Sequence, residues 1–185
     1  PHFPKKTVFI PCPIVVGERP NIPDTPPDRL NLFIGISKHR SAYKGTDIML
    51  RAAETVKEHY PDKLNLKLVT GLPFDEYVRT MLGSDAIMDQ LYSYTPSMNP
   101  LEAMAHGIIC IGGGEPENYA ILNETVLHPI INVLPTYESC VEELTKLVNN
   151  LSLIPSLRRQ SYEYVRKHHD FIKVAQAYIE LYRGL

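Results

Sequence analysis

Cations cluster in the polar stretch that follows the first long apolar run of the chain. Lys38, Arg40 and Lys44 fall within seven positions, and Gly45 follows them. A diphosphate needs such charges, and a helix that begins just after them adds backbone N–H groups and a partial positive charge. The spacing predicts a phosphate site in which Lys38 or Arg40 acts together with Lys44; a solvated basic loop is the alternative. The pattern matches neither a Walker loop nor the dinucleotide fingerprint, because GxxxxGK[ST] and GxGxxG are absent.

Carboxylates with a possible binding role lie in the stretch from Ser84 to Glu117. Asp89 follows a short apolar run, where it could act in catalysis or cap a loop. Glu102 falls in the first turns of the helix predicted next, and its carboxylate could accept hydrogen bonds from both hydroxyls of a ribose. An exposed surface glutamate is the alternative for Glu102.

Three glycines, Gly112, Gly113 and Gly114, follow the next apolar run. Glycine permits positive φ and close backbone approach, so N–H groups in this loop could hold a phosphate or a sugar hydroxyl. A flexible turn is the alternative. The histidines give weaker signals: His168 and His169 are expected at the surface, and no Ser/His/Asp or Cys/His arrangement is evident.

Apolar runs that alternate with amphipathic segments must position these loops. The alternation predicts an α/β fold, a Rossmann-like doubly wound parallel sheet with helices on both faces. In such sheets ligands bind outside the carboxyl ends of the strands, where the loops above lie. The expected strands are Leu30–Gly35, Leu64–Gly71, Ala86–Met88, Ile108–Ile111 and Pro129–Val133. The expected helices are Asp47–His59, Pro73–Leu82, Ser97–His106, Glu117–Leu122, Pro135–Asn150, Pro155–His168 and Phe171–Tyr182.

Residues 1–29 differ from the rest and hold about half of the 16 prolines. Proline cannot donate in a sheet or continue a helix, so this segment is expected to be an extended lead-in between domains. Thr7–Ile10 and Ile14–Val16 could form short edge strands, and a disordered terminus is the alternative. The predicted division is a lead-in of residues 1–29 and one binding domain of residues 30–185.

Composition excludes several classes of function. The net charge of −2 gives no basic field for nucleic acid, and no apolar run is long enough to span a membrane. The three cysteines are far apart and fit free thiols in a reducing compartment, so a cytoplasmic protein is expected.

Three motifs, in this order, resemble the C-terminal, nucleotide-sugar-binding domain of retaining glycosyltransferases with the GT-B architecture, family 4 in particular. They are Lys44-Gly45, the segment LEAMAHGIICI from Leu101 to Ile111, and Gly114-Glu115-Pro116-Glu117. The resemblance covers roughly residues 30 to 185, and LEAMA-x-G is its most specific part. It implies one half of a GT-B fold, in which a separate N-terminal domain binds the acceptor. A start at proline instead of methionine agrees with an excised domain.

The resemblance also implies roles for individual residues. Lys44 would bind the donor pyrophosphate together with Lys38 or Arg40, and Glu102 would bind the ribose. The family's first glutamate falls at Tyr94, so Asp89 and Gln90 are candidates to replace it, or Tyr94 could stack on a sugar or base. The expected catalytic residues are Lys38, Arg40 and Lys44, and the expected substrate-binding residues are Gly35, Gly45, Asp89, Gln90, Tyr94, Glu102, Gly113, Gly114 and Glu117.

The function implied by this resemblance is transfer of a sugar from a nucleotide-diphosphate sugar to an acceptor. The acceptor would be a glycan or a lipid-linked glycan held by the N-terminal domain, and the full-length protein could lie at the inner face of a membrane. No cofactor or metal is expected, because the cations can neutralise the phosphates and no Asp-x-Asp motif is present. The alternatives are a non-catalytic module that binds a nucleotide or a protein partner, and a sugar-nucleotide epimerase of similar architecture.

Overall fold

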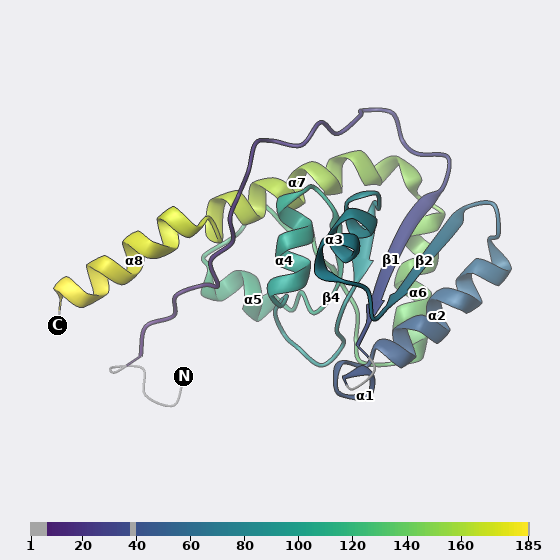
Figure 1. Ribbon diagram of the computed structural model, residues 1–185, viewed down its shortest axis with the longest axis horizontal. Coiled ribbons are helices and arrows are strands. Elements are labelled where there is room, and N and C mark those ends of the chain that lie inside the picture. The colour runs from purple at the N-terminus through teal and green to yellow at the C-terminus, as the bar shows by residue number, and fades with distance from the viewer. Residues whose placement is uncertain (1–6, 38–39, 185) are drawn as a thin grey trace.

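The computed structural model describes residues 7–37 and 40–184 (Figure 1). Five parallel strands form one sheet in the order β2-β1-β3-β4-β5. The strands are β1 (Leu30–Ile36), β2 (Leu64–Thr70), β3 (Ala86–Met88), β4 (Ile109–Gly112) and β5 (Ile131–Asn132). The order reverses between β1 and β3, which is the switch point at which open α/β sheets bind ligands.

Helices connect the strands and cover the sheet. They are α1 (Ser41–Lys44), α2 (Thr46–His59), α3 (Phe74–Leu82), α4 (Met98–Ala105), α5 (Pro116–Ile121), α6 (Tyr137–Val148), α7 (Ile154–His168) and α8 (Phe171–Arg183), with a short 3-10 turn at Leu151–Leu153. The expected elements are therefore present, with bounds that differ by one to a few residues. The basic stretch after β1 was expected to be a loop throughout; this was wrong for Ser41–Lys44, which form a turn of helix.

Alternate residues of each strand pack into two hydrophobic layers. Leu32 of β1 and Met88 of β3 contact the layer formed with α2 and α6. Phe33 follows Leu32 and Ile87 precedes Met88, and both pack with α3 and α4 on the other face of the sheet. This alternation follows from the period of two in a strand and confirms the doubly wound α/β class.

The lead-in is bound to the domain through the junction between α7 and α8. Ile14 is buried, its N–H donates to the His169 carbonyl at 2.7 Å, and its carbonyl accepts from the Phe171 N–H at 3.0 Å. Figure 1 shows the lead-in passing this junction and then crossing the top of the molecule to β1, while α8 extends away from the body. The expected edge strands were wrong: in residues 7–29 the only ladder contact is the isolated bridge between Ile14 and Asp170.

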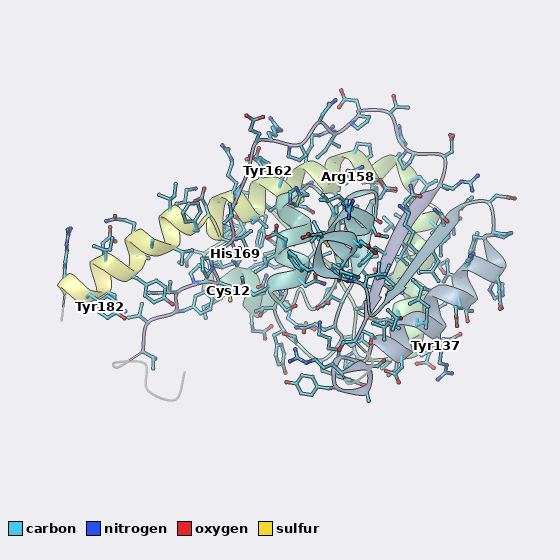
Figure 2. All side chains as sticks on the ribbon, in the orientation of Figure 1. Cys12, Tyr137, Arg158, Tyr162, His169 and Tyr182 are labelled. Atoms are coloured by element: carbon cyan, nitrogen blue, oxygen red, sulfur yellow. The ribbon has the colours of Figure 1, made fainter. Side chains whose placement is uncertain are left out.

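His168 and His169 are not the surface residues that the sequence suggested. The ring of His169 is buried, and its Nδ1 lies 3.0 Å from the Cys12 carbonyl. Figure 2 shows His169 and Cys12 near each other at the end of α7. His168 contacts the buried carboxylate of Glu124, which also accepts from Lys167 at 2.7 Å. Burial alone would raise the pKa of Glu124, but hydrogen bonds from His168, Lys167 and two backbone N–H groups hold it well below its usual range. No helix in the described ranges could span a membrane.

We predict that His169 makes the stability of the fold depend on pH. Burial lowers the pKa of its imidazole from 6.5 to about 4, and nearby His168 adds to the lowering, against a hydrogen bond with the Cys12 carbonyl. The unfolded chain therefore takes up this proton first as the pH falls. The contribution of the neutral His169 ring to the free energy of unfolding is fully present above about pH 6.5. It decreases by about 2 to 3 kcal/mol as the pH falls towards 4.

Urea denaturation of the wild type and of His169→Gln at about pH 7 and about pH 4.5 measures this effect. The free energy of unfolding should fall more steeply in the wild type than in His169→Gln. The exposed His59 provides the control, because His59→Gln should keep the wild-type slope. Equal slopes in the wild type and His169→Gln would show that the buried ring does not titrate as described.

Candidate functional site

A cavity of about 600 Å³ opens at the carboxyl ends of β1, β2 and β3. Its volume falls in the range of small-molecule sites, and it lies at the switch point of the sheet. The residues that line it are Gly35, Ile36, Ser37, Lys44, Val69, Gly71, Leu72, Phe74, Tyr77, Asp89 and Asn99. Gly35, Lys44 and Asp89 are thus the predicted site residues that the fold brings together here.

Asp89 is the buried charge of the cavity, with 3% of its surface exposed. Lys44 Nζ lies 2.8 Å from both carboxylate oxygens. Asn99 donates to Oδ1 at 2.9 Å, and the Ser97 hydroxyl donates to Oδ2 at 2.9 Å. A carboxylate has about four acceptor positions, so these four hydrogen bonds fill it. A buried carboxylate paired in this way stays compatible with the interior of a protein.

The turn between α1 and α2 places Lys44 over Asp89. Gly45 has φ of 70°, in the left-handed region that side chains disfavour, and it ends α1. A Cβ at Gly45 would also lie 3.0 Å from Leu91. The Leu91 N–H donates to the Lys44 carbonyl at 2.8 Å, which joins this turn to the loop after β3. Both the backbone and the side chain of Lys44 are therefore held by the segment that carries Asp89.

Tyr77 and Asn99 are polar cavity residues that were not among the predicted site residues. The Asn99 amide donates to the Tyr77 hydroxyl at 2.8 Å as well as to Asp89. Burial raises the pKa of Tyr77 to about 12, the Asn99 hydrogen bond lowers it in part, and Asp89 raises it further, so the hydroxyl keeps its proton. The sequence contains one signal that could have identified Asn99. It lies three residues before Glu102, a predicted binding residue, and residues three apart are neighbours on the surface of a helix.

The cavity has one apolar end. Its wall is formed by Val69 near the end of β2, Leu72 in the loop after β2, and Phe74, the first residue of α3. Phe74 has 75% of its surface exposed. Ligand cavities of this kind combine apolar walls with a few polar groups that fix orientation. Here the polar groups are Lys44, Asp89, Asn99 and Tyr77.

Several predicted site residues lie outside the cavity lining. Lys38 is outside the described residues, and Arg40 is exposed at the start of α1. Tyr94 is 69% exposed, and Glu117 is exposed in the first turn of α5. Gln90 is partly buried between Asp89 and Leu91. Their roles stay predictions.

Glu102 also lies outside the cavity lining. Its side chain is 40% exposed, and its carboxylate lies 3.5 Å from His106 Nε2, one turn further along the chain. Asn99, one turn earlier, takes the position that faces the cavity. The ribose role of Glu102 stays a prediction, with its carboxylate directed to His106 in this structure.

The glycine loop after β4 packs against the loop after β3. A Cβ at Gly113 would lie 1.6 Å from the Ser93 carbonyl oxygen, so only glycine fits there. The Gly114 N–H donates to Asn132 Oδ1 at 3.0 Å, and the Glu115 N–H donates to the Tyr94 carbonyl at 3.3 Å. These contacts occupy two N–H groups that were candidates for phosphate or sugar binding. The glycines therefore allow the loop after β4 to pack closely against the loop after β3.

We predict that Gly113→Ala destabilises the fold by about 2 kcal/mol or more, because the backbone of one loop must move to admit the methyl group. Gly17→Ala is the matched control, since a Cβ there has no neighbour within 4 Å and its φ is ordinary. Thermal or urea unfolding measures both variants. A Gly113→Ala variant as stable as Gly17→Ala would contradict the packing of Gly113 against Ser93.

Among residues 7–37 and 40–184, no group of three or more His, Cys, Asp or Glu side chains is placed to hold a metal ion. Cys12, Cys110 and Cys140 are free, and the last two are buried. The expectation of metal-independent chemistry stays a prediction.

Known protein structures share this fold, although no match is found by sequence. No protein-family model and no curated protein matches the sequence. Among solved structures, a mutant of S. aureus TarM in complex with fondaparinux, alpha-GlcNAc-glycerol and UDP aligns over 97% of this chain and 40% of its own, with 12% identity and a TM-score of 0.66. Anabaena HepE in complex with UDP and glucose aligns over 85% of this chain and 49% of its own, with 11% identity and a TM-score of 0.58.

A third match has nearly the same extent as this chain. The C-terminal domain of a glycosyl transferase group 1 family protein, LpcC from Francisella tularensis, aligns over 78% of this chain and 88% of its own, with 16% identity and a TM-score of 0.59. This chain spans half or less of the TarM and HepE chains. The described residues therefore have the fold of the C-terminal domain of a GT-B glycosyltransferase.

Proposed function

We infer that this chain is the donor-binding domain of a glycosyltransferase, and that its cavity takes the nucleoside diphosphate of a nucleotide sugar. One observation carries this inference: Lys44 is held over a buried carboxylate in a cavity at the switch point of the sheet. Proteins of the same fold, TarM and HepE, have structures in complex with UDP. The apolar end would accept the base and the Lys44 end the diphosphate.

The geometry of Lys44 suits a phosphate oxygen. An ammonium group has three donors, and the two contacts with Asp89 leave one N–H for a ligand. Lys44 can therefore contact a diphosphate without leaving Asp89. As the bond between the sugar and the diphosphate breaks, negative charge develops on the leaving group, and a fixed cation next to it stabilises that charge.

Asp89 then acts as a positioning residue. Its four acceptor positions are filled by Lys44, Asn99 and Ser97, so a sugar hydroxyl would have to displace one of them. This favours a role in holding Lys44 over a role as the missing sugar-facing carboxylate. Arg40 or Lys38 would supply further charge to the phosphates.

A second domain would hold the acceptor, a glycan or a lipid-linked glycan, at the mouth of the cavity. We expect retention at the anomeric carbon from the sequence resemblance, and cytoplasmic transfer without a metal, so that EDTA leaves donor affinity unchanged. Turnover of a panel of nucleotide sugars by the full-length protein separates transfer from binding alone, and an epimer formed without acceptor would indicate an epimerase.

We predict that Lys44→Ala weakens binding of UDP or GDP about tenfold or more, since a hydrogen bond to a charged group contributes roughly 1.5–3 kcal/mol. Isothermal titration calorimetry of the full-length protein measures this. Removal of Lys44 alone leaves the buried Asp89 without its cation, which itself destabilises the fold. The double variant Lys44→Ala/Asp89→Asn avoids that charge and should fold while still binding weakly.

Lys146→Ala is the control, because Lys146 lies exposed on α6 and pairs with Glu142 and Glu143. It should bind UDP and GDP as the wild type does. If the wild type binds neither nucleotide at millimolar concentration, the proposed function is wrong.

A further inference from the structure

Two tyrosines lie exposed at the turn that carries Lys44. Tyr43 precedes Lys44 in α1 and has 82% of its surface exposed. Tyr92 lies in the loop after β3 and has 55% of its surface exposed. A Cβ at Gly45 would lie 3.1 Å from Cε2 of Tyr92, so this ring lies against the glycine that ends α1. Both tyrosines therefore lie at the same corner of the domain.

This corner adjoins the charged end of the cavity. Lys44 and Asp89 line the cavity, and the Lys44 carbonyl accepts from the Leu91 N–H at 2.8 Å. Tyr43 directly precedes Lys44 in the chain, and Tyr92 directly follows Leu91. Neither tyrosine belongs to the cavity lining. Figure 1 shows α1 beyond the carboxyl end of β1, so the two tyrosines lie at the rim of the site.

The proposed donor orientation directs the reacting sugar towards this rim. With the base at the apolar end of the cavity and the diphosphate at Lys44, the sugar extends beyond Lys44. Transfer requires an acceptor hydroxyl next to the anomeric carbon of that sugar. The remainder of an acceptor that is longer than one sugar unit therefore passes over the surface around Lys44, where Tyr43 and Tyr92 are exposed.

The chemistry of both side chains suits a sugar chain. A pyranose ring presents a face of C–H bonds that packs on an aromatic ring, and its hydroxyls lie around the edge. A tyrosine has an apolar ring and a polar tip, and it loses little conformational entropy when it binds. Among residues 7–37 and 40–184, neither the Tyr43 nor the Tyr92 hydroxyl has a hydrogen-bond partner, so both are available to a ligand.

We propose that Tyr43 and Tyr92 form a stacking surface for an acceptor glycan beside the donor cavity. This inference rests on the proposed function, since the position of the donor places the acceptor. It goes further in one respect, because the domain that binds the donor also holds part of the acceptor. Two separate rings stack on separate sugar units, so the ligand is an oligosaccharide and not a single sugar.

The test titrates the full-length protein, with UDP or GDP present, with three probes: maltohexaose, cellohexaose and chitohexaose. NMR titrations measure the affinities. At least one probe should bind at millimolar concentration, because every pyranose can offer a C–H face to an exposed ring. Tyr43→Ala and Tyr92→Ala should each weaken that binding about three- to tenfold, the range expected for loss of one aromatic contact. The affinity for UDP or GDP should stay unchanged in both variants.

Two kinds of control separate stacking from other effects. Tyr43→Phe and Tyr92→Phe keep the rings and should retain most of the affinity for the oligosaccharide. Tyr182→Ala removes a ring that is 70% exposed on α8, and Figure 2 shows this residue near the far end of that helix. It should bind the oligosaccharide as the wild type does.

Each contrary outcome has a distinct meaning. If UDP or GDP binds but no probe does, or if both alanine variants bind the probes as the wild type does, the inference fails and the proposed function stands. An equal loss of nucleotide and oligosaccharide affinity in Tyr92→Ala would also overturn the inference, because the ring would then act through the turn at Lys44. Wild-type binding to phosphatidylglycerol vesicles that both alanine variants lose, without oligosaccharide binding, would assign the tyrosines to a membrane surface. If the wild type binds no nucleotide, the proposed function and the inference both fail.

Discussion

The buried carboxylate of Asp89 constrains the whole carboxyl edge of the sheet. It lies directly after β3 with only 3% of its surface exposed, so it requires a cation and hydrogen-bond donors within the protein. Lys44 is the last residue of α1, and Ser97 and Asn99 come from the start of α4. One charge thereby joins the segments that follow β1 and β3. The cavity takes its shape from this arrangement.

A second buried carboxylate, Asp85, lies at the opposite end of the same short strand. It accepts from Arg158 of α7 at 2.9 Å and from the Asn31 backbone at 2.9 Å. Arg158 also donates to the Gly107 carbonyl at 2.7 Å, which joins α7 to the turn before β4. Figure 2 shows Arg158 reaching from α7 towards the strands. Asp85 fixes the packing of the domain, whereas Asp89 borders a cavity that a ligand can enter.

The loops that follow β3 and β4 approach each other closely. Gly113 lies against the Ser93 carbonyl, and Gly114 is tied to Asn132 at the end of β5. The loop after β3 is thus held between the turn at Lys44 and the glycine loop. This explains why Gly113 and Gly114 follow β4 although neither lines the cavity.

Local pattern determined much of this protein. Periods of two and of 3.6 residues, with Pro and Gly at the boundaries, were sufficient for the parallel α/β fold, and the position of Lys44 and Asp89 after strands was sufficient to expect both at one edge. The motif LEAMA-x-G also indicated the class of fold that the structural comparisons support.

Only the tertiary structure decided which side chains meet. Tyr77 and Asn99 are separated by 22 residues, and no local pattern shows that α3 and α4 bring them together under the cavity. Whether Glu102 or Asn99 faces the cavity depends on the rotation of α4, which its packing against the sheet sets. His169 looks like a surface residue in the sequence and becomes buried because the lead-in, more than 150 residues earlier, packs over it. Sequence periodicity reports contacts within an element, while the site depends on contacts between elements far apart in the chain.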